Sequence, residues 1–496
     1  MNRRHIATLL FLMLAIHLYA ATADSTLIEF KSLWNSFRQP AWQNPAIHGK
    51  AFKTSLSQLY AAADWQRQSE AFVQEKGKGF LLPAAYADTY LRLSESAAVW
   101  GQASYMNGRY DGICWNSTSD YDILQPYVLA DSVGGDTSSE RYVFEGGYAT
   151  QLGHWLLGAE MLFRANHEYR DIDPRMRGVV NELTIRLGAG YEAKGYHWAA
   201  AVEGNVYKQS NSVDFYRELG ASPEYQMTGL GTEYARFSGD KRRLHYEGGG
   251  VRLLLDVEPV SERGLFAHIG LSRHSYHRQI IENYTLPLTD LYSQGAEAVV
   301  GWQRPGSRQL AVYATLGYEK RSGDERVIGT SASTAFPELC VLTMYKNNRL
   351  HTSLSALCGT RRWQATASVG YKSDNQEYVY PQRKLDVSHL YGRLEGQLFL
   401  KPADRLLLTC GAKASYLAGV SDELLMPFAN MSAAFAAKMH HQYEYAKASY
   451  TGLSAQVRGD FQLKDIGLFA EMGGGYTACS VGEHQADAHL AFGITF

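Results

Sequence analysis

The sequence predicts an all-β protein: a transmembrane antiparallel up-and-down barrel of about 16 strands (about 14–18), with a short N-terminal helical segment. Three observations lead to this prediction. Apolar and polar residues alternate with a period of two along most of the chain, short and long connections alternate between these stretches, and Phe496 ends the last alternating stretch. Strands of a soluble sandwich also alternate, so the connections distinguish the two architectures.

Residues 1–23 have the pattern of a cleavable signal peptide. A positive start at residues 2–4 precedes an apolar run at 6–20, and a small-x-small site follows at 21–23. The run is too short to span a bilayer as a helix, and no cysteine follows it as a lipid attachment point. We therefore expect export in a Gram-negative bacterium, with cleavage before Asp24. A buried N-terminal helix is the alternative.

The composition fits a barrel in the outer membrane. After the signal peptide no apolar run reaches the roughly 20 residues of a membrane helix, whereas barrel strands alternate and escape such a search. The chain has 33 Tyr, 19 Phe, 9 Trp and 46 Gly but only 13 Pro. Tyr and Trp are typical of the aromatic belts of such barrels. The formal net charge of −2 gives no support for a nucleic-acid partner.

The start of the mature chain differs from the rest. Its apolar residues are spaced as in a short amphipathic helix: Leu27, Ile28, Phe30, Leu33, Trp34 and Phe37. We interpret residues 24–48 as a helical segment that plugs the lumen or lies at the periplasmic mouth. Residues 49–496 would then form the barrel.

Alternating stretches recur at regular intervals. In one of them the apolar phase is Leu183, Ile185, Leu187, Ala189 and Tyr191, and the opposite phase carries Glu182 and Arg186. Aromatic residues gather where such stretches end at short connections, which is typical of an interfacial girdle. They include Tyr148, Trp155, Tyr191, Trp198 and Trp363.

The connections set the strand number. Short ones are expected near 152–154, 192–195, 258–263, 304–308, 359–362, 401–404 and 463–466. Long ones are expected near 107–139, 166–178, 209–243, 278–292, 321–347, 373–387, 421–441 and 480–486. Bacterial barrels have short periplasmic turns and long external loops. Counting back from the C-terminus reaches a strand near 97–106; residues 52–60 and 80–93 would add one hairpin. We interpret 336–349 as a loop folded over the mouth.

The C-terminal strand resembles the signal that outer-membrane barrels present to their assembly machinery. Its apolar phase ends in Leu490, Phe492, Ile494 and Phe496 and carries no charge. The expected partners are therefore this machinery and outer-membrane lipid.

The inward phases carry both signs of charge. A barrel of about 16 strands is wide enough for an aqueous channel unless it is plugged. The candidate lumen-lining residues are Glu160, Arg164, Glu182, Arg186, Arg252, Asp256, Arg393, Glu395, Arg458 and Asp460. We expect such a hydrated wall to tolerate Arg186→Gln at little cost.

No motif indicates a cofactor, a metal or a nucleotide. The five cysteines are scattered, without a Cys-x-x-Cys pair, and their odd number leaves at least one unpaired within the chain. The glycine runs at 146–147, 248–250 and 473–475 lie inside strand patterns, with no following helix to bind a phosphate. We expect no cofactor and no metal.

A barrel-embedded hydrolase or acyltransferase is the enzymatic alternative. His268, Ser272 and His274 share one strand face, and His440 and His441 lie beside an expected external loop. No base, nucleophile and orienting group can be assembled into one set, so we name no catalytic residue and expect no enzyme.

A polar cluster at 169–177 lies in an expected external loop. It contains Arg170, Asp171, Asp173, Arg175 and Arg177 around an Asp-Pro step. We interpret it as a turn held by internal ion pairs, with binding of a charged ligand or cation as the alternative.

Several stretches resemble an uncharacterised family of outer-membrane β-barrel proteins of about this length. They are Trp100-Gly101-x-Ala103-x-Tyr105-x-Asn107-Gly108, Gln125-Pro126-Tyr127 with Asp131-Ser132, Glu140-x-Tyr142-x-Phe144-x-Gly146-x-Tyr148, and residues 168–175. The resemblance implies fold and location but no activity. Asn44-Pro45-Ala46 also resembles the N-terminal motif of hydrophobic-compound transporters related to the fatty-acid channel.

These observations leave two functional hypotheses open. The first is passage or binding of a small solute through a lumen partly filled by the N-terminal segment or by loops. The second is a non-conducting barrel that serves as a partner or scaffold in an envelope complex. The sequence does not identify a solute.

Overall fold

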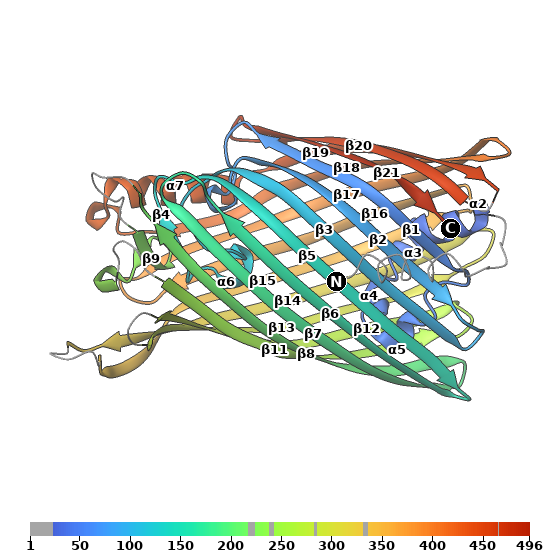
Figure 1. The fold of residues 1–496 in the computed structure, drawn as a ribbon, viewed down its shortest axis with the longest axis horizontal. Coiled ribbons are helices and arrows are strands. Elements are labelled where there is room, and N and C mark those ends of the chain that lie inside the picture. Colours follow the sequence, from blue (N-terminus) through green and yellow to red (C-terminus); the bar gives the residue numbers. More distant parts are fainter. Residues whose placement is uncertain (1–22, 217–223, 238–242, 282–284, 331–335, 465) are drawn as a thin grey trace, which may run out of the picture.

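The computed structural model describes residues 23–216, 224–237, 243–281, 285–330, 336–464 and 466–496. Apart from Ala23, the predicted signal peptide lies outside these residues. Eighteen antiparallel strands form one closed sheet, in which β1 pairs with both β2 and β21. The strands are tilted around a long barrel (Figure 1). The predicted barrel is confirmed, and the additional N-terminal hairpin is present as β1 and β2.

Each strand pairs with its neighbours in the chain, apart from the crossing at the seam. The strands are β1 (Leu56–Gln68), β2 (Gly79–Arg92), β3 (Ala97–Ile113), β5 (Gly135–Leu152), β6 (Trp155–Tyr169), β7 (Arg175–Ala193), β8 (Tyr196–Asp214), β11 (Arg243–Pro259), β12 (Gly264–Ile281), β13 (Thr285–Arg304), β14 (Gln309–Ile328), β15 (Glu338–Gly359), β16 (Trp363–Tyr378), β17 (Arg383–Ala403), β18 (Leu406–Leu425), β19 (Tyr450–Leu463), β20 (Ile466–Cys479) and β21 (His484–Thr495).

The outer face of the barrel is apolar. Ile185 and Leu187 on β7 are 45% and 61% exposed, and Phe492 on β21 is 67% exposed. Large apolar side chains on the outward phase of nearly every strand share this exposure. Such a surface is incompatible with water over a whole barrel but is what a bilayer solvates. The protein is therefore an outer-membrane β-barrel; recognition of β21 by the assembly machinery stays a prediction.

Exposed aromatic side chains lie near the short turns, as predicted. They include Tyr148, Trp155, Tyr191, Trp198 and Trp363. The rings of Trp155 and Tyr191 lie 4.9 Å apart between centroids. A second exposed group lies on the strands farther from the short turns: Tyr105, Tyr142, Tyr318, Tyr416 and Tyr476. Together the two groups flank the apolar surface.

Several predicted long loops are instead strand. In the expected loop at 278–292, residues 278–281 and 285–292 belong to β12 and β13, and the expected loop at 373–387 is reduced to the residues between Tyr378 and Arg383. The prediction that 336–349 folds over the mouth is wrong. From Glu338 these residues belong to β15 and pair with β14, with bulges in the ladder. Strand pairs can extend beyond a membrane because the ladder satisfies their backbone polar groups without lipid or loop contacts.

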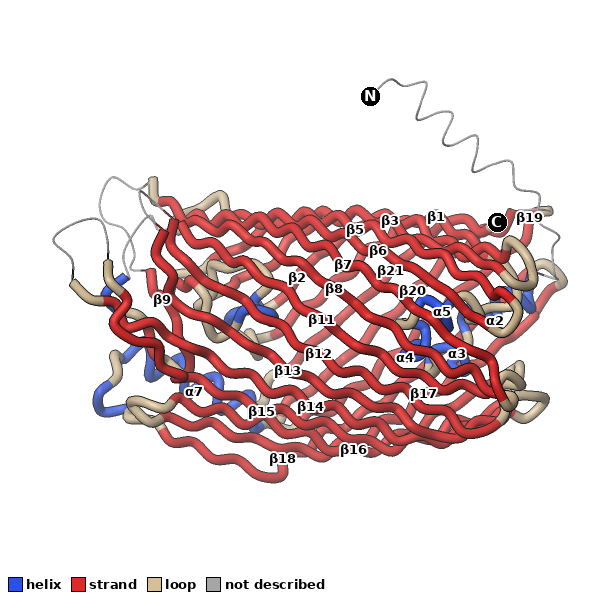
Figure 2. The backbone as a smooth tube through the Cα atoms, turned by 90° about the horizontal axis from the view of Figure 1, so that it is seen from below, coloured by secondary structure: helices blue, strands red, loops and turns tan. Residues whose placement is uncertain are grey.

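The N-terminal segment lies inside the barrel at its short-turn end (Figures 1 and 2). The sequence predicted one amphipathic helix here. The structure has four short helices instead: α2 (Ala23–Lys31), α3 (Leu33–Ser36), α4 (Gln39–Trp42) and α5 (Pro45–His48). The first break occurs at Ser32, whose extended backbone and side chain cap α3 at Asn35 N. Among the described residues, no helix has the length and apolar character needed to cross a bilayer.

The long-loop end is filled by connecting segments. These are η1 (Gln74–Lys76), α6 (Tyr121–Leu124), β4 (Leu129–Asp131), β9 (Glu224–Gly229), β10 (Thr232–Glu233), η2 (Ala235–Phe237), η3 (Phe428–Asn430) and α7 (Ala433–Lys447). β4, β9 and β10 form a small separate sheet. Their side chains and the strand ends share a hydrophobic core whose fully buried members include Leu124, Tyr127, Leu129, Leu244 and Ile280.

Candidate functional site

The N-terminal segment is fixed to the barrel wall through Asn44. This residue is completely buried; its Oδ1 accepts from Ala46 N at 3.1 Å, which caps α5, and its Nδ2 donates to Asp256 Oδ2 at 2.8 Å. Pro45 and Asn44 approach the wall where it has no side chains. A Cβ at Gly158 would lie 2.4 Å from Pro45 C, and one at Gly188 would lie 2.3 Å from Asn44 Oδ1. These glycines are required for the segment to seat.

Asp256 belongs to a buried polar group on the wall. The imidazole of His268 lies between two carboxylates, with Nδ1 3.0 Å from Asp256 Oδ1 and Nε2 3.2 Å from Glu258 Oε1. All three residues are at most 5% exposed. Since Asn44 donates to the same Asp256, the segment and the wall share one hydrogen-bond network. We call the Asn44–Asp256–His268 group the latch.

A second contact lies around Glu160. Its Oε2 accepts from Trp100 Nε1 at 2.9 Å and lies 3.8 Å from His48 Nδ1 at the end of α5. Its other oxygen pairs with Arg186, which also donates from Nε to Glu203 at 2.5 Å. The charged side chains of the wall at this point therefore contact the N-terminal segment or form ion pairs with one another.

At the opposite end of the barrel, buried polar contacts join the loops to one another. Arg170, whose side chain is 1% exposed, pairs with Asp131 at 2.8 Å and donates to Thr137 Oγ1 at 3.1 Å. Lys438 on α7 pairs with Glu75, each side chain being 7% exposed. Burial raises the pKa of Tyr121 well above its ordinary value, which keeps this phenol protonated and neutral within the closed end. We call this assembly the cap.

Single strands run past both closures. On β15, Leu357 packs against Trp34 and Phe37 of the N-terminal segment, whereas Tyr345 belongs to the core of the cap. Between them, Arg349 and His351 line a cavity. At about 3.3 Å per residue, the strand distance from Leu357 to Tyr345 is roughly 40 Å, so the two closures are separate.

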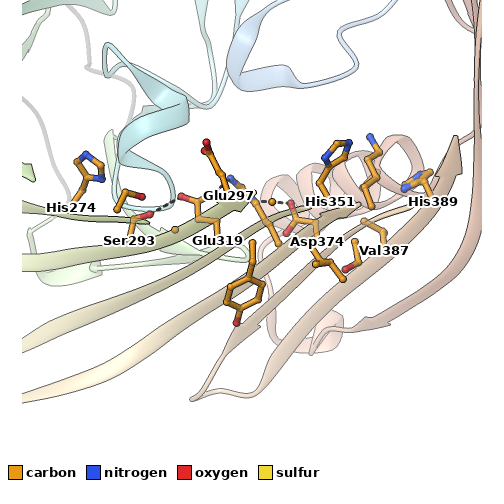
Figure 3. Close-up of a pocket in the computed structure, with 17 residues that line it drawn as sticks. His274, Ser293, Glu297, Glu319, His351, Asp374, Val387 and His389 are labelled. Atoms are coloured by element: carbon orange, nitrogen blue, oxygen red, sulfur yellow. Dashed lines mark hydrogen bonds and ion pairs between the residues drawn. The ribbon is translucent and has the colours of Figure 1, made fainter. Parts of the chain in front are cut away.

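The cavity is a chamber of about 620 Å³ against β12–β17, with α7 contributing Ala446. Figure 3 shows the labelled His274, Glu297, Glu319, His351 and His389 along this wall. The polar lining is completed by Ser272, Ser293, Arg349, Lys372, Ser373 and Asp374. The volume falls within the range of pockets that enclose small molecules.

The acidic groups of the chamber are already paired with arginines. Arg349 lies between Glu319 and Asp374, at 3.4 Å and 3.2 Å. Glu297 pairs with Arg252 at 2.6 Å. These pairs leave the carboxylates largely neutralised.

A family of unknown function (DUF6850) matches residues 45–496. The chain belongs to this family. A search of curated proteins found no match. Among solved structures, similarity extends to the ferric preacinetobactin receptor BauA of Acinetobacter baumannii, with 8% identity over 89% of this chain and 79% of that one and a TM-score of 0.42. The ferric yersiniabactin uptake receptor FyuA of Yersinia pestis has 8% identity over 89% and 80% of the chains and a TM-score of 0.46.

The predicted lumen residues of this DUF6850 barrel fall into different surroundings. Seven of them contact the N-terminal segment, the cap or one another: Glu160, Arg164, Glu182, Arg186, Asp256, Arg458 and Asp460. Arg164, for example, donates to Asp120 beside α6 at 2.8 Å as well as to Glu182. Arg458 pairs with Asp460 at 2.7 Å and with Glu471 at 3.3 Å. Only Arg252 pairs with a chamber residue, Glu297.

The main residues of the chamber wall were not among the predicted lumen residues. Glu319, Arg349, Lys372 and Asp374 lie on the inward phases of β14–β16. The signal was weak, because polar residues also occupy the opposite phase: Lys320 follows Glu319, Asn348 precedes Arg349, and Asp374 lies between Ser373 and Asn375. It was hidden because 321–347 and 373–387 were interpreted as loops, which cut the strand patterns short.

The residues of the enzymatic alternative are spread over three environments. His268 is held in the latch, whereas Ser272 and His274 lie in the chamber. His440 stacks on Phe428 with ring centroids 4.1 Å apart, and His441 Nε2 lies 3.5 Å from Glu70. Across the described part of the chain, no three His, Cys, Asp or Glu side chains are grouped to hold a metal ion.

The cluster at 169–177 is largely engaged by the protein itself. Besides Arg170 in the cap, Arg175 donates to Asp173 at 3.0 Å and lies over the ring of Tyr216 at 4.2 Å. Asp173 also accepts from Tyr216 N at 2.9 Å. These contacts favour the interpretation of a turn held by ion pairs. All five cysteines lie within the described residues, and all five are free.

Proposed function

We propose that this protein binds a small polar solute inside its barrel and passes it across the outer membrane through a lumen closed at both ends. The supporting observation is the polar chamber of about 620 Å³ between the N-terminal segment and the cap. A barrel that served only as a scaffold would not need an interior cavity lined by charged side chains. No enzymatic step is included in the proposal.

The two closures differ in how they are built. The N-terminal segment is held by short-range contacts of four short helices, above all the latch. The cap has a continuous apolar core and buried ion pairs. Helices of four residues have little stability of their own, so the N-terminal segment depends on the contacts that its residues make with the wall.

Single-channel recording of the purified protein in planar bilayers tests this function. Asn44→Ala removes the α5 cap and the donor to Asp256, so openings should become more frequent at unchanged unit conductance. Gln39→Ala is the control, because Gln39 is an exposed residue of the same segment. A double variant, Asn44→Ala with Lys438→Gln, loosens both ends and should open more often still.

The alternative is the non-conducting barrel in an envelope complex. It predicts that the wild type and the double variant are both silent, although both remain folded by their heat-modified mobility on gels. That outcome would overturn the transport proposal. Openings in the double variant but none in the single variant would identify the cap as the dominant closure.

A further inference from the structure

Three basic side chains lie in one row across the chamber wall. In the ladder of the sheet His351 on β15 is paired with Lys372 on β16, and Lys372 is paired with His389 on β17. All three line the chamber. In Figure 3 His351 and His389 lie on the same side of the wall. Directly paired residues of a sheet have neighbouring side chains, so these groups act on the same small volume.

Lys372 lacks the compensation that the other charges of the chamber have, whereas His389 Nε2 lies 3.2 Å from Ala448 O. Among the described residues, Lys372 has no carboxylate within ion-pair distance, and its side chain is exposed to the chamber. Asp374, two residues along the same face, is taken by Arg349 at 3.2 Å. A lysine that faces an interior cavity without a carboxylate partner is costly without a counter-ion.

Hydrogen-bonding groups lie beside the row. Tyr391 OH is 2.6 Å from His351 Nε2, and the two rings stack with centroids 5.5 Å apart. The Tyr391 ring lies over Gly370, where a Cβ would be 2.5 Å from Tyr391 Cζ. One inward position further along β17 is Arg393, which is exposed and, within the described chain, has no carboxylate partner at ion-pair distance.

We propose that the His351–Lys372–His389 row, with Arg393 beside it, binds the anionic group of the solute, a phosphate or a carboxylate. The inference rests on the proposed solute function and specifies its substrate class. A cation fixed in a partly dehydrated chamber gains from an anion more than in bulk water, because screening is weaker there. The chamber carboxylates do not repel such a ligand strongly, since Arg252 pairs with Glu297 and Arg349 lies between Glu319 and Asp374.

Equilibrium dialysis of the full-length protein in detergent tests the site, with radiolabelled inorganic phosphate in one arm and succinate in the other. The expected result is saturable binding of at least one probe and a loss of about tenfold or more in affinity for Lys372→Gln, as for removal of one charged hydrogen-bond donor. Lys372→Arg keeps the charge and should bind within about threefold of the wild type on the same reasoning. The preferred probe identifies the anionic group.

Lys384→Gln is the matched control. Lys384 lies on the same sheet, but it pairs with Asp386 at 2.9 Å and Glu423 at 2.6 Å outside the chamber. Its loss should leave binding unchanged. Equal affinity of Lys372→Gln and the wild type for the probes would overturn the proposal. It would also be overturned if neither probe bound saturably to the wild type. Heat-modified mobility verifies that each variant is folded.

The two proposals can fail separately. A protein that opens in bilayers but binds neither probe retains the transport function and loses the anion site. A silent protein that binds phosphate or succinate through Lys372 retains the anion site and loses transport.

Discussion

Arg186 illustrates how strongly one residue can depend on its partners. It joins Glu160 and Glu203, whose side chains are 3% and 10% exposed. The sequence predicted a hydrated, forgiving position; the structure places the guanidinium between two nearly buried carboxylates. We therefore no longer expect Arg186→Gln to have little effect on the free energy of unfolding, and expect a large loss instead.

Arg186→Gln should lower the free energy of unfolding by about 3 kcal/mol, because it leaves two largely buried carboxylates without their cation. Lys208→Gln is the control: its ion pair with Glu247 spans 3.9 Å, with side chains 67% and 54% exposed. That change should cost less than about 1 kcal/mol. Urea unfolding in lipid vesicles measures both, and equal costs would contradict the buried network.

Ile185→Arg tests the outward face. Ile185 lies six residues from Tyr191 of the short-turn girdle, so in a tilted strand it sits near the middle of an apolar band about 25 Å tall. The substitution should cost about 2–4 kcal/mol in vesicles. Ile172→Arg, at a loop residue that is 76% exposed, should cost almost nothing. A tolerant Ile185 would contradict the assigned phase.

The sequence alone predicted which way side chains point but not which groups they meet. The phase of Ile185 and Arg186 follows from a period of two, which is local. Whether Arg186 meets Glu160 or another carboxylate depends on the register between β6, β7 and β8. That register is fixed by the geometry of the connecting turns, which a single sequence does not display.

At the scale of elements, the position of the N-terminal segment depends on Gly158 and Gly188, two wall residues without side chains. Gly158→Val would place side-chain atoms where Pro45 lies, since even a Cβ comes within 2.4 Å of its backbone. The segment should leave its seat while the strand, which favours valine, remains paired. Limited trypsin digestion in vesicles should then cleave after Arg38.

Gly204→Val provides the comparison, because a Cβ there meets nothing within 4 Å. If Arg38 is equally protected from trypsin in the Gly158 and Gly204 variants, the wall does not hold the segment. Urea unfolding of both variants checks that the barrel itself is intact.

Elements were predictable where their pattern was repeated, and poorly predictable where it was unique. The strands from β3 onward and the N-terminal hairpin carry many alternating residues. By contrast, the apolar spacing of 27–37 fits one helix, but Ser32 turns the chain and caps a new one. The long-loop ends of β14 and β15 contain bulges that interrupt the period, so a strand resembled a loop.

For the whole molecule, the alternation of turns and loops predicts its orientation. The long-loop end, with α7 and the cap, should face the outside of the cell. Epitope tags in the connections at 166–178, 209–243 and 421–441 should therefore be labelled on intact cells, whereas a tag at 401–404 should react only after permeabilisation. The reverse labelling would place the N-terminal segment outside and invert the proposed path.

The separation of the two closures has a consequence for the permeability barrier of the cell. The latch and the cap share no residue, so a solute meets two barriers, one after the other, that can open independently. If each were open about 1% of the time, as minor states often are, both would be open together only about 0.01% of the time. On the proposed function, a wide barrel can then admit a metabolite stepwise while antibiotics and detergents rarely meet a continuous water path.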